Sequence, residues 1–519
     1  MQVLATDDFK VSWPDPAMAE RPWLADRMHM PDPVPQLAWH TVGTFFEGVF
    51  GARVIFVNGY QYGPPPNLPG PPPEVKERGL AAWHEVYVPR IREYFERMKA
   101  TDFDALQIAE LEGSLDGWIG EAMECFRLTM VVVSTFMTPT FGLVSFLEQA
   151  LGPEGPVLAG TILQGTENAS AGAGAALGRL AEQARQYPEL AAALVAGDHD
   201  RLDARPGGAA FMGAFSDYLN EYGWRAQSWG VIHRPTWAEN PTVPLAIIGR
   251  YLANPGDSPV AAVKRSVEGR ARALQEAESR LTPEQLERFR ELVAATRHHV
   301  PISEERALWQ LTTVGVLRRP LMALGRKLAA AGAFDSPDDI FYIERHELSE
   351  AATNPGPQFA ERARLGRAEY EHWRTLSAPP LLGAMPDPST VAPEVAAMAR
   401  YFFGLGDHPR EQGAVSGFGA SAGIVTGRAR VIRNLDESGR LEPGDILVCA
   451  STAPPWTPLF AIAAAVVTDT GGVMSHSAIC AREFGIPCVV GTQVGTNVIP
   501  DGATVRVDGT TGRVEMLAD

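Results

Sequence analysis

The sequence predicts a multidomain α+β protein, in which a large, mostly helical region precedes a smaller domain that mixes strands and helices. Three observations support this prediction. The 519 residues exceed the size of one hydrophobic core, so roughly two to four domains are expected. Apolar side chains recur at helical spacing over most of residues 75–380. From residue 417 onwards, short apolar runs alternate with glycine-rich turns, a pattern typical of strands.

The first part of the chain is rich in tryptophan and proline. We expect residues 1–75 to form an extended segment packed on the helical region, with a stiff loop at the two proline triplets within 62–74. Residues 76–382 are predicted to be mainly helical, because several patterns open on a proline or stop before one. The expected helices include 89–98, 103–113, 175–186, 260–280, 283–294 and 307–319.

One stretch is apolar enough to be considered as a membrane span. Residues 128–147 carry no charge over about the 20 residues that cross a bilayer. They also contain serine, threonine and Pro139, and charged residues flank them on both sides. We therefore expect a buried pair of helices with a break near Pro139, because proline interrupts a helix.

Charge and cysteine content narrow the class of protein. The formal net charge is −17 and there is no dense stripe of lysine and arginine, which argues against nucleic-acid binding. The four cysteines show no metal-binding spacing and suit a reducing cytosol better than a disulfide framework. The N-terminus lacks the pattern of a signal peptide. These features predict a soluble cytoplasmic protein without a metal site.

A change in composition marks a boundary late in the chain. Residues 383–416 are enriched in proline, glycine and aspartate, as linkers between domains often are. We therefore predict a hinge over this segment, followed by a separate C-terminal domain over 417–519.

The most informative stretch is 468–482, with the sequence TDTGGVMSHSAICAR. An apolar run at 460–467 predicts a strand before it, and 485–491 predicts a turn and a second strand after it. A Gly-Gly turn at a helix N-terminus favours anions, because glycine permits close approach and the helix dipole and free N–H groups attract negative charge. His476 is either a phosphoryl carrier or a buried side chain satisfied by a carbonyl, and the whole pattern favours the carrier.

This stretch resembles the swivelling phosphohistidine domain of the PEP-utilising enzymes. Residues 419–431, 443–448 and 501–509 resemble other parts of that domain, although Ala422 stands where the family usually has proline. The resemblance implies a β/β/α domain in which His476 is phosphorylated. The residues expected to contact the phosphoryl group are Thr468, Gly471, Gly472, Ser475 and Arg482.

Parts of the helical region resemble the substrate-binding region of the branch that contains rifampin phosphotransferase and phenylphosphate synthase. The resemblance lies in residues 29–35 and in two islands within 215–241 and 301–343. It implies that a charged cluster faces the acceptor alcohol, and the aromatic first island predicts an aromatic or alicyclic acceptor. The residues expected to bind it are Glu304, Arg306 (near the position of a lysine in the rifampin enzymes), Arg225 and Trp237.

The resemblance implies an ATP-dependent phosphotransferase with more than one subunit. We recognise neither an ATP-grasp nucleotide domain nor the barrel that binds PEP, so an ATP-grasp partner is expected to bind MgATP and phosphorylate His476. No cofactor is expected on this chain. Two alternatives stay open, namely a lyase or dehydratase with transient phosphorylation and a non-catalytic phosphocarrier or regulatory module. Arg482 is likewise open to a structural salt bridge in place of phosphoryl or nucleotide binding.

Overall fold

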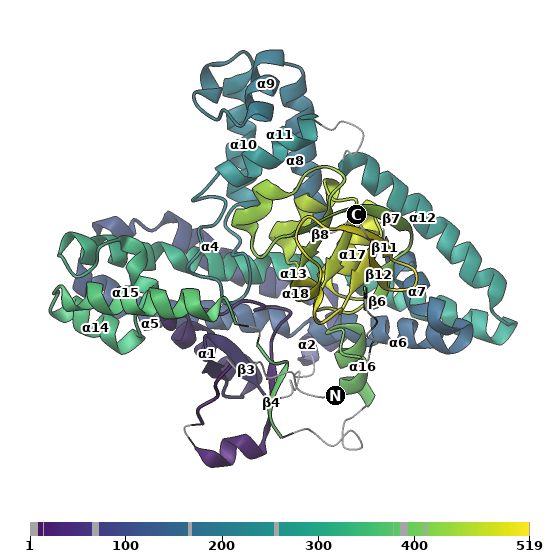
Figure 1. Ribbon diagram of the computed structural model, residues 1–519, viewed down its shortest axis with the longest axis horizontal. Coiled ribbons are helices and arrows are strands. Elements are labelled where there is room, and N and C mark those ends of the chain that lie inside the picture. Colours follow the sequence, from purple (N-terminus) through teal and green to yellow (C-terminus); the bar gives the residue numbers. More distant parts are fainter. Residues whose placement is uncertain are drawn as a thin grey trace. The chain divides into compact units, whose positions relative to one another are not determined.

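The computed structural model describes residues 9–13, 15–64, 72–164, 169–253, 259–376, 378–384, 393–406, 408, 411 and 413–517. The chain divides into two units, each built from three separate segments. Figure 1 shows the helices and strands coloured along the sequence. The first unit comprises residues 1–134, 225–235 and 309–391, and the second comprises 135–224, 236–308 and 392–519. These limits do not coincide with the predicted domain boundaries at 75, 382 and 416.

The first unit contains an antiparallel sheet of four strands in the order β2-β3-β1-β4. Three of its strands come from the segment predicted to be merely extended, and the fourth comes from about 320 residues later in the chain. The segment folds as a sheet because its aromatic side chains, such as Trp23 and Tyr62, are buried in a common core. The strands are β1 (Pro22–Ala25), β2 (Ile55–Val57), β3 (Tyr60–Gly63) and β4 (Leu381–Gly383).

Helices make up most of the first unit, as predicted. The prediction for 89–98 is confirmed, whereas 103–113 divides into a short 3-10 helix and the start of a much longer α-helix. These helices are η1 (Pro16–Glu20), α1 (Gln36–Phe50), α2 (Pro73–Arg78), α3 (Leu80–Ala82), η2 (Trp83–Tyr87), α4 (Val88–Ala100), η3 (Phe103–Ala105), α5 (Ile108–Met130), η7 (Pro337–Tyr342), α14 (Arg345–Thr353) and α15 (Gln358–Trp373).

The second unit is helical over its first two segments. These helices are α6 (Val133–Leu151), η4 (Gly152–Glu154), α7 (Gly155–Leu163), α8 (Ala169–Arg185), α9 (Pro188–Ala196), η5 (Leu202–Ala204), α10 (Gly208–Tyr222), α11 (Thr242–Ala253), α12 (Pro259–Arg280) and α13 (Pro283–Ala330). Helix α6 begins just before the boundary between the units, and α13 continues beyond residue 308 into the first unit. The predictions for 175–186 and 260–280 are confirmed.

The break predicted near Pro139 is wrong, and two helices that were predicted separately are continuous. Pro139 lies inside α6, and the interruption falls earlier, at Val131 and Val132. The two helices predicted over 283–294 and 307–319 are one helix of 48 residues, which runs through Pro301. A proline removes one main-chain hydrogen bond, and surrounding packing can stabilise a helix in spite of that loss.

The segment Ile108–Leu151 is long and apolar enough to cross a membrane by length and composition alone. In this structure 56% of its most apolar window is buried inside the protein. Core helices of soluble proteins share these properties, so the segment fits the predicted buried helix pair, apart from the position of its break.

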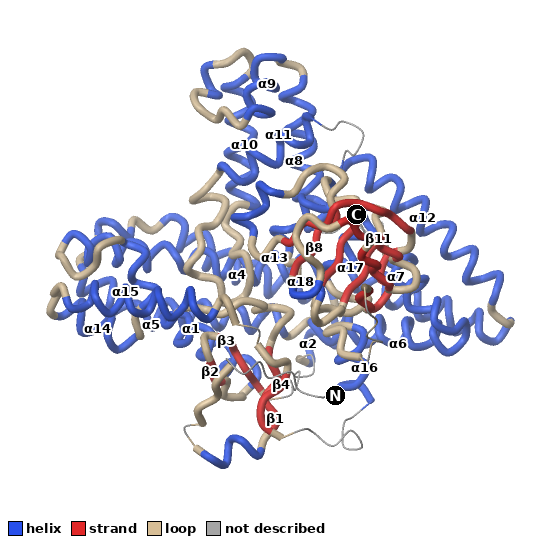
Figure 2. Tube along the Cα trace, viewed as in Figure 1, coloured by secondary structure: helices blue, strands red, loops and turns tan. Residues whose placement is uncertain are grey.

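The strands of the second unit form one sheet of eight strands in the order β5-β12-β11-β7-β8-β9-β10-β6. Figure 2 shows strands of this sheet in red, with β8 and β11 labelled. Its central strands β7, β8, β9 and β10 are parallel, and the others pair antiparallel. The strands are β5 (Ala414–Ser416), β6 (Phe418–Ser421), β7 (Ile424–Val431), β8 (Ile446–Cys449), β9 (Ala465–Thr468), β10 (Cys488–Val490), β11 (Thr504–Asp508) and β12 (Arg513–Met516). The molecule is therefore a multidomain α+β protein, as predicted.

Short helices connect these strands, namely α16 (Pro393–Tyr401), η9 (Leu435–Arg440), η10 (Pro454–Ala461), α17 (His476–Phe484) and α18 (Gly495–Val498). The strand predicted over 460–467 is wrong at its start, because Phe460 belongs to the proline-rich helix η10, which ends at Ala461, and the strand begins at Ala465. The predicted hinge over 383–416 contains α16 and the first strand of the sheet. Residues 385–392, 407, 409, 410 and 412 of that segment lie outside the described part.

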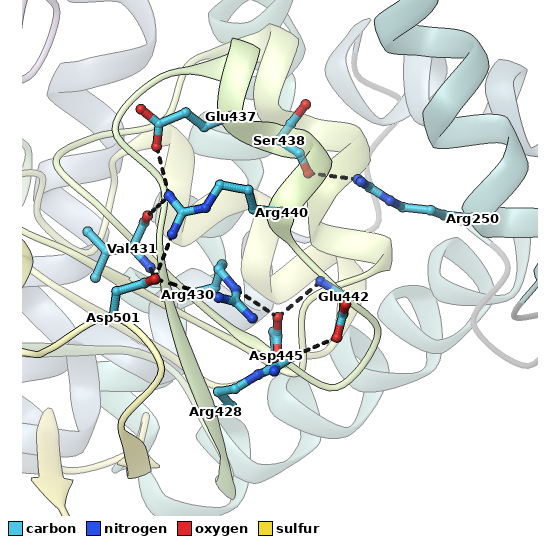
Figure 3. Close-up of polar contacts among 10 residues, drawn as sticks. All are labelled: Arg250, Arg428, Arg430, Val431, Glu437, Ser438, Arg440, Glu442, Asp445 and Asp501. Carbon is cyan, nitrogen blue, oxygen red and sulfur yellow. Dashed lines mark hydrogen bonds and ion pairs between the residues drawn. The ribbon is translucent and has the colours of Figure 1, made fainter. Parts of the chain in front are cut away.

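A network of ion pairs lies on the surface of this sheet (Figure 3). At its centre the buried carboxylate of Asp445 accepts hydrogen bonds from Arg428 at 2.9 Å and from Arg430 at 3.3 Å. Asp501 accepts from Arg440 at 2.6 Å. These contacts connect β7 with the turns before β8 and β11. We refer to Arg428, Arg430, Glu437, Arg440, Glu442, Asp445 and Asp501 as the sheet network.

Candidate functional site

His476 is the first residue of α17, and the loop before this helix starts at the end of the buried strand β9. Ser475 is the N-cap residue, and Gly485 ends the helix in a left-handed conformation with φ of 69°. The strand, the loop and the helix N-terminus are therefore arranged as the sequence predicts. The first N–H groups of α17 point out of the helix end that carries the positive side of its dipole.

The Gly-Gly loop is attached to the end of α16 by main-chain hydrogen bonds. The N–H groups of Gly471 and Gly472 donate to the carbonyls of Phe403 and Phe402 at 3.1 and 2.7 Å. A Cβ atom on Gly472 would lie only 2.3 Å from the carbonyl oxygen of Tyr401. Glycine is therefore required at 472, where two segments of main chain lie close together. The N–H groups of both glycines are already bonded within the protein in this structure.

Two other residues expected to bind the phosphoryl group differ in their surroundings. The hydroxyl of Thr468 is fully buried and donates to the carbonyl of Thr470 at 2.8 Å. The hydroxyl of Ser475 is also buried, but it has no hydrogen-bond partner in the described part of the chain. Of the two, only Ser475 has a donor available for a group bound at His476.

The imidazole of His476 lies between a carboxylate and a hydroxyl. Nδ1 lies 3.3 Å from a carboxylate oxygen of Glu304, and Nε2 lies 3.3 Å from Thr457 Oγ1. The sulfur of Cys480 lies 3.4 Å from Nε2, and the ring of Phe460 meets the imidazole edge-to-face at 6.5 Å. Only 12% of the His476 side chain and 6% of the Glu304 side chain are exposed. The site is thus a largely buried His–Glu pair, with an exposed portion on the histidine.

These neighbours determine the charge of the imidazole. Burial by itself lowers the pKa of His476, but Cys480 and the Glu304 carboxylate more than offset this effect. The pKa of His476 is raised from its ordinary value of 6.5 to about 10. At neutral pH the ring is therefore a cation paired with the carboxylate.

Arg482 connects two parts of the main chain. Its Nη1 group donates to the carbonyls of Ala420 and Val473, each at 2.8 Å. Burial lowers the pKa of its guanidinium to about 10. In this structure Arg482 thus ties strand β6 to the loop that precedes α17, an arrangement that neither predicted alternative described.

The residues expected to bind the acceptor differ in their surroundings. Glu304 contacts His476 directly. The guanidinium of Arg306 is buried over the ring of Phe136 at 5.4 Å, and burial lowers its pKa to about 10 although Glu304 opposes the change. Arg225 belongs to the first unit, whereas His476 belongs to the second.

Trp237 is a core residue rather than part of a pocket wall. It is 5% exposed and stacks on Tyr218 at 6.5 Å within a hydrophobic cluster of the second unit. Trp237 therefore packs in the core, and its predicted contact with an acceptor stays a prediction. Large aromatic side chains bury much apolar area, so core packing is their usual role.

Two neighbours of the imidazole were not predicted as site residues. Cys480 follows His476 by four positions, and this spacing on a helix brings the two side chains together. Thr457 belongs to η10, and nothing in the local sequence indicates that its hydroxyl faces His476. Among the described residues, no group of three or more His, Cys, Asp or Glu is placed to hold a metal ion.

Comparison with protein families bears on this site. The model described as "PEP-utilising enzyme, mobile domain" matches residues 441–512, which include His476. This part of the chain is thus similar to the mobile domain of the PEP-utilising enzymes. A second model, described as the rifampicin phosphotransferase fourth domain, matches residues 127–304 and ends at Glu304. The two partners of the His–Glu pair thus come from two separately matched regions.

Curated relatives agree with the resemblance to the PEP-utilising enzymes. The chain is 30% identical over 454 residues to chondramide synthase cmdD of Chondromyces crocatus, covering 84% of this chain and 12% of that protein. It is 30% identical over 321 residues to the uncharacterized phosphotransferase YvkC of Bacillus subtilis strain 168, covering 62% and 38%. It is 30% identical over 403 residues to the rifampicin phosphotransferase of the same strain, covering 75% and 44%. The chain spans less than half the length of each relative.

Proposed function

We propose that this chain is a phosphotransferase component that carries a phosphoryl group on His476 and passes it to a hydroxyl of a small organic acceptor. The observation that carries the proposal is the His476–Glu304 pair. A ring nitrogen able to bear the phosphoryl group lies against a carboxylate able to accept the proton of an alcohol. The relatives named as phosphotransferases, and the match to the mobile domain, support the same class of reaction.

We propose that the phosphoryl donor is MgATP bound to an ATP-grasp partner subunit. A protonated imidazole has no lone pair with which to attack phosphorus. The contact with Glu304 favours the protonated ring, so His476 accepts the phosphoryl group where this carboxylate is absent. The mobile domain then brings the phosphohistidine back to Glu304, the kind of step that domain motions commonly control.

Transfer to the acceptor then proceeds with a balanced exchange of bonds. The alcohol oxygen forms a bond to phosphorus while the P–N bond breaks, and that electron pair stays on the imidazole. Glu304 accepts the hydroxyl proton, acting as a general base. The proton passes to the neutral imidazole and regenerates the ion pair between His476 and Glu304. The free hydroxyl of Ser475 and the first N–H groups of α17 are positioned to bind phosphoryl oxygens.

The test measures the phosphohistidine directly. The chain is mixed with candidate ATP-grasp subunits and ATP labelled with ³²P at the β-phosphate, the position that the resemblance implies. Wild type is expected to take up label that is labile in acid and stable in base, and His476→Ala to take up none. A matched control replaces the exposed His298 with alanine and is expected to label normally. Label that persists in His476→Ala contradicts the proposal, as does a wild type that stays unlabelled with every candidate.

The same reaction separates the proposed transfer from its alternatives. Release of a phosphorylated product from a hydroxylated acceptor supports the phosphotransferase. Loss of the hydroxyl with release of inorganic phosphate indicates a lyase or dehydratase. Stable labelling of His476 with no acceptor consumed indicates a phosphocarrier module.

A further inference from the structure

A small cavity lies beside Glu304 inside the second unit. Its volume is ≈ 40 Å³, which is room for a few water molecules or for the end of a small organic molecule. The wall is mainly apolar, with Phe136, Phe141, Phe402 and Met137 among its members. Glu304 is also one of the residues that line the cavity, so the partner of His476 borders this space.

Most polar groups in the wall are already bonded within the protein. The carboxylate of Glu483 accepts from Ser266 at 2.7 Å. The side-chain amide of Gln164 donates to the carbonyl of Ser266 at 3.1 Å. Arg482 donates to two main-chain carbonyls. These groups hold the fold together around the cavity.

The hydroxyl of Thr140 is different. It lines the cavity and is 3% exposed, and Oγ1 has no hydrogen-bond partner in the part of the chain that the structure describes. A buried hydroxyl without a partner is unfavourable and uncommon, because it loses its bonds to water without replacing them. A buried hydroxyl without a partner and a carboxylate-bearing residue in the wall of the same small cavity indicate room there for a polar group that could bond to both.

We propose that this cavity is the acceptor site and takes the hydroxyl-bearing end of an uncharged, apolar alcohol. This inference rests on the function proposed above, because it identifies the acceptor that receives the phosphoryl group from His476. The apolar walls bury the hydrocarbon end. Thr140 Oγ1 donates to the alcohol oxygen, and the alcohol O–H donates to Glu304.

The charges around the cavity favour a neutral ligand. Glu304 and Glu483 both line it, and each has a cation near it, His476 for Glu304 and Arg482 for Glu483. An acceptor that already carries a phosphate or carboxylate would bring a further, unpaired negative charge into a largely apolar space, which is unfavourable. Thr140 and the apolar wall therefore select among alcohols, and Glu304 selects for the hydroxyl.

The test measures binding to the chain alone, without ATP or a partner, by fluorine NMR. The probes are trifluorobutanol and 4-fluorobenzyl alcohol, each compared with its hydroxyl-free counterpart, trifluorobutane or 4-fluorotoluene. At least one alcohol is expected to bind more tightly than its counterpart. Thr140→Val is expected to weaken that alcohol about fivefold to tenfold, the effect of losing one neutral hydrogen bond, and Thr140→Ser to retain its affinity.

Two further variants control for packing. Thr161→Val removes a hydroxyl that already donates to the carbonyl of Val157 at 2.9 Å, and is expected to leave alcohol binding unchanged. Met137→Phe adds a ring to the cavity wall and is expected to abolish binding. Thr140→Val is expected to keep or raise the melting temperature, because it removes an unsatisfied group.

The outcomes separate this inference from the proposed function. The inference is overturned if neither alcohol binds wild type more tightly than its counterpart, or if Thr140→Val or Met137→Phe binds as wild type does. Hydroxyl-dependent binding to a chain whose His476 never takes label would refute the proposed transfer and leave the alcohol site standing. Labelling of His476 without hydroxyl-dependent binding would support the proposed transfer and refute the alcohol site.

Discussion

The second unit contains two groups of charged side chains that differ in nearly every physical respect. The sheet network lies mostly on the surface, where Arg428 and Arg440 are 45% and 44% exposed. It connects neighbouring turns and strands of one sheet (Figure 3). The pair of His476 and Glu304 is 12% and 6% exposed and joins two regions that are distant in the sequence. The network stabilises a local structure, whereas the pair keeps a reactive nitrogen beside a base.

This difference determines what each group contributes. Exposed ion pairs are solvated and contribute little to folding, so the loss of one costs little. A buried charge is stable only with its partner, and removal of one member leaves the other unpaired. Asp445 lies between these extremes, because it belongs to the network but its side chain is only 4% exposed. The comparison can therefore be tested by substitutions in each group.

The largest effect is expected from Glu304→Gln. The amide keeps the size of the side chain but cannot accept the hydroxyl proton, so transfer to the acceptor should slow by about 10²–10⁴-fold. Labelling of His476 should persist, and the phosphohistidine should accumulate in a pulse-chase measurement. Glu291→Gln, at an exposed position on the same helix, is the matched control and should transfer normally. Product release by the Glu304→Gln variant at the wild-type rate would show that Glu304 is not the general base.

The next largest effect is expected from Asp445→Ala. This change leaves Arg428 and the largely buried Arg430 without their shared carboxylate and removes the acceptor for the N–H of Glu442. Urea unfolding should show a loss of about 3–5 kcal/mol. Glu442→Ala, whose side chain is 66% exposed, should cost about 1 kcal/mol or less. Equal losses in the two variants would show that burial does not distinguish members of the network.

A smaller effect, visible only through pH, is expected from His476→Gln. Because the folded-state pKa of His476 is raised from 6.5 to about 10, its charge stabilises the fold fully below pH 6.5. This contribution is lost as pH rises through about 10. The stability difference between wild type and variant should therefore shrink from neutral to alkaline pH, measured by urea unfolding. A stability difference that grows with pH would contradict the raised pKa of His476.

The smallest effect is expected from Arg440→Gln. This guanidinium is 44% exposed and contacts Asp501 and Glu437 at the edge of the network. Its removal should cost about 0–1 kcal/mol in thermal or urea unfolding, and less at high salt because exposed charges are screened. A loss as large as that of Asp445→Ala would place Arg440 among the buried, indispensable charges.

Local sequence predicted the main-chain elements that form the site but not all of the side chains that contact His476. The turn, the start of α17 at His476 and strand β10 follow from glycine, helix-cap and apolar signals that act over a few residues. The contact with Thr457 depends on how two elements pack, and no local signal indicates it. Glu304 was expected to face the acceptor through a family resemblance, but its bond to the imidazole is a tertiary contact. The site therefore combines predictable geometry with partners that only the folded chain brings together.

The same limit explains the errors in the helical region. Local rules place a break near Pro139, but α6 continues through this proline, and α13 continues through Pro301. Trp237 was expected to bind the acceptor, yet it packs in a hydrophobic cluster, where burial of its large ring is favourable. In each case the tertiary environment outweighs a preference that is readable over a short window.

The attachment of the Gly-Gly loop to residues 401–403 has a mechanical consequence. The N–H groups of the two glycines and of Met474 donate to carbonyls at the end of α16. A displacement of the chain before this helix is therefore transmitted to the loop that precedes His476. These hydrogen bonds involve main-chain atoms only. Substitutions of the side chains at 401–403 can therefore leave the connection intact, provided that glycine remains at 472 so that the two main-chain segments can approach each other.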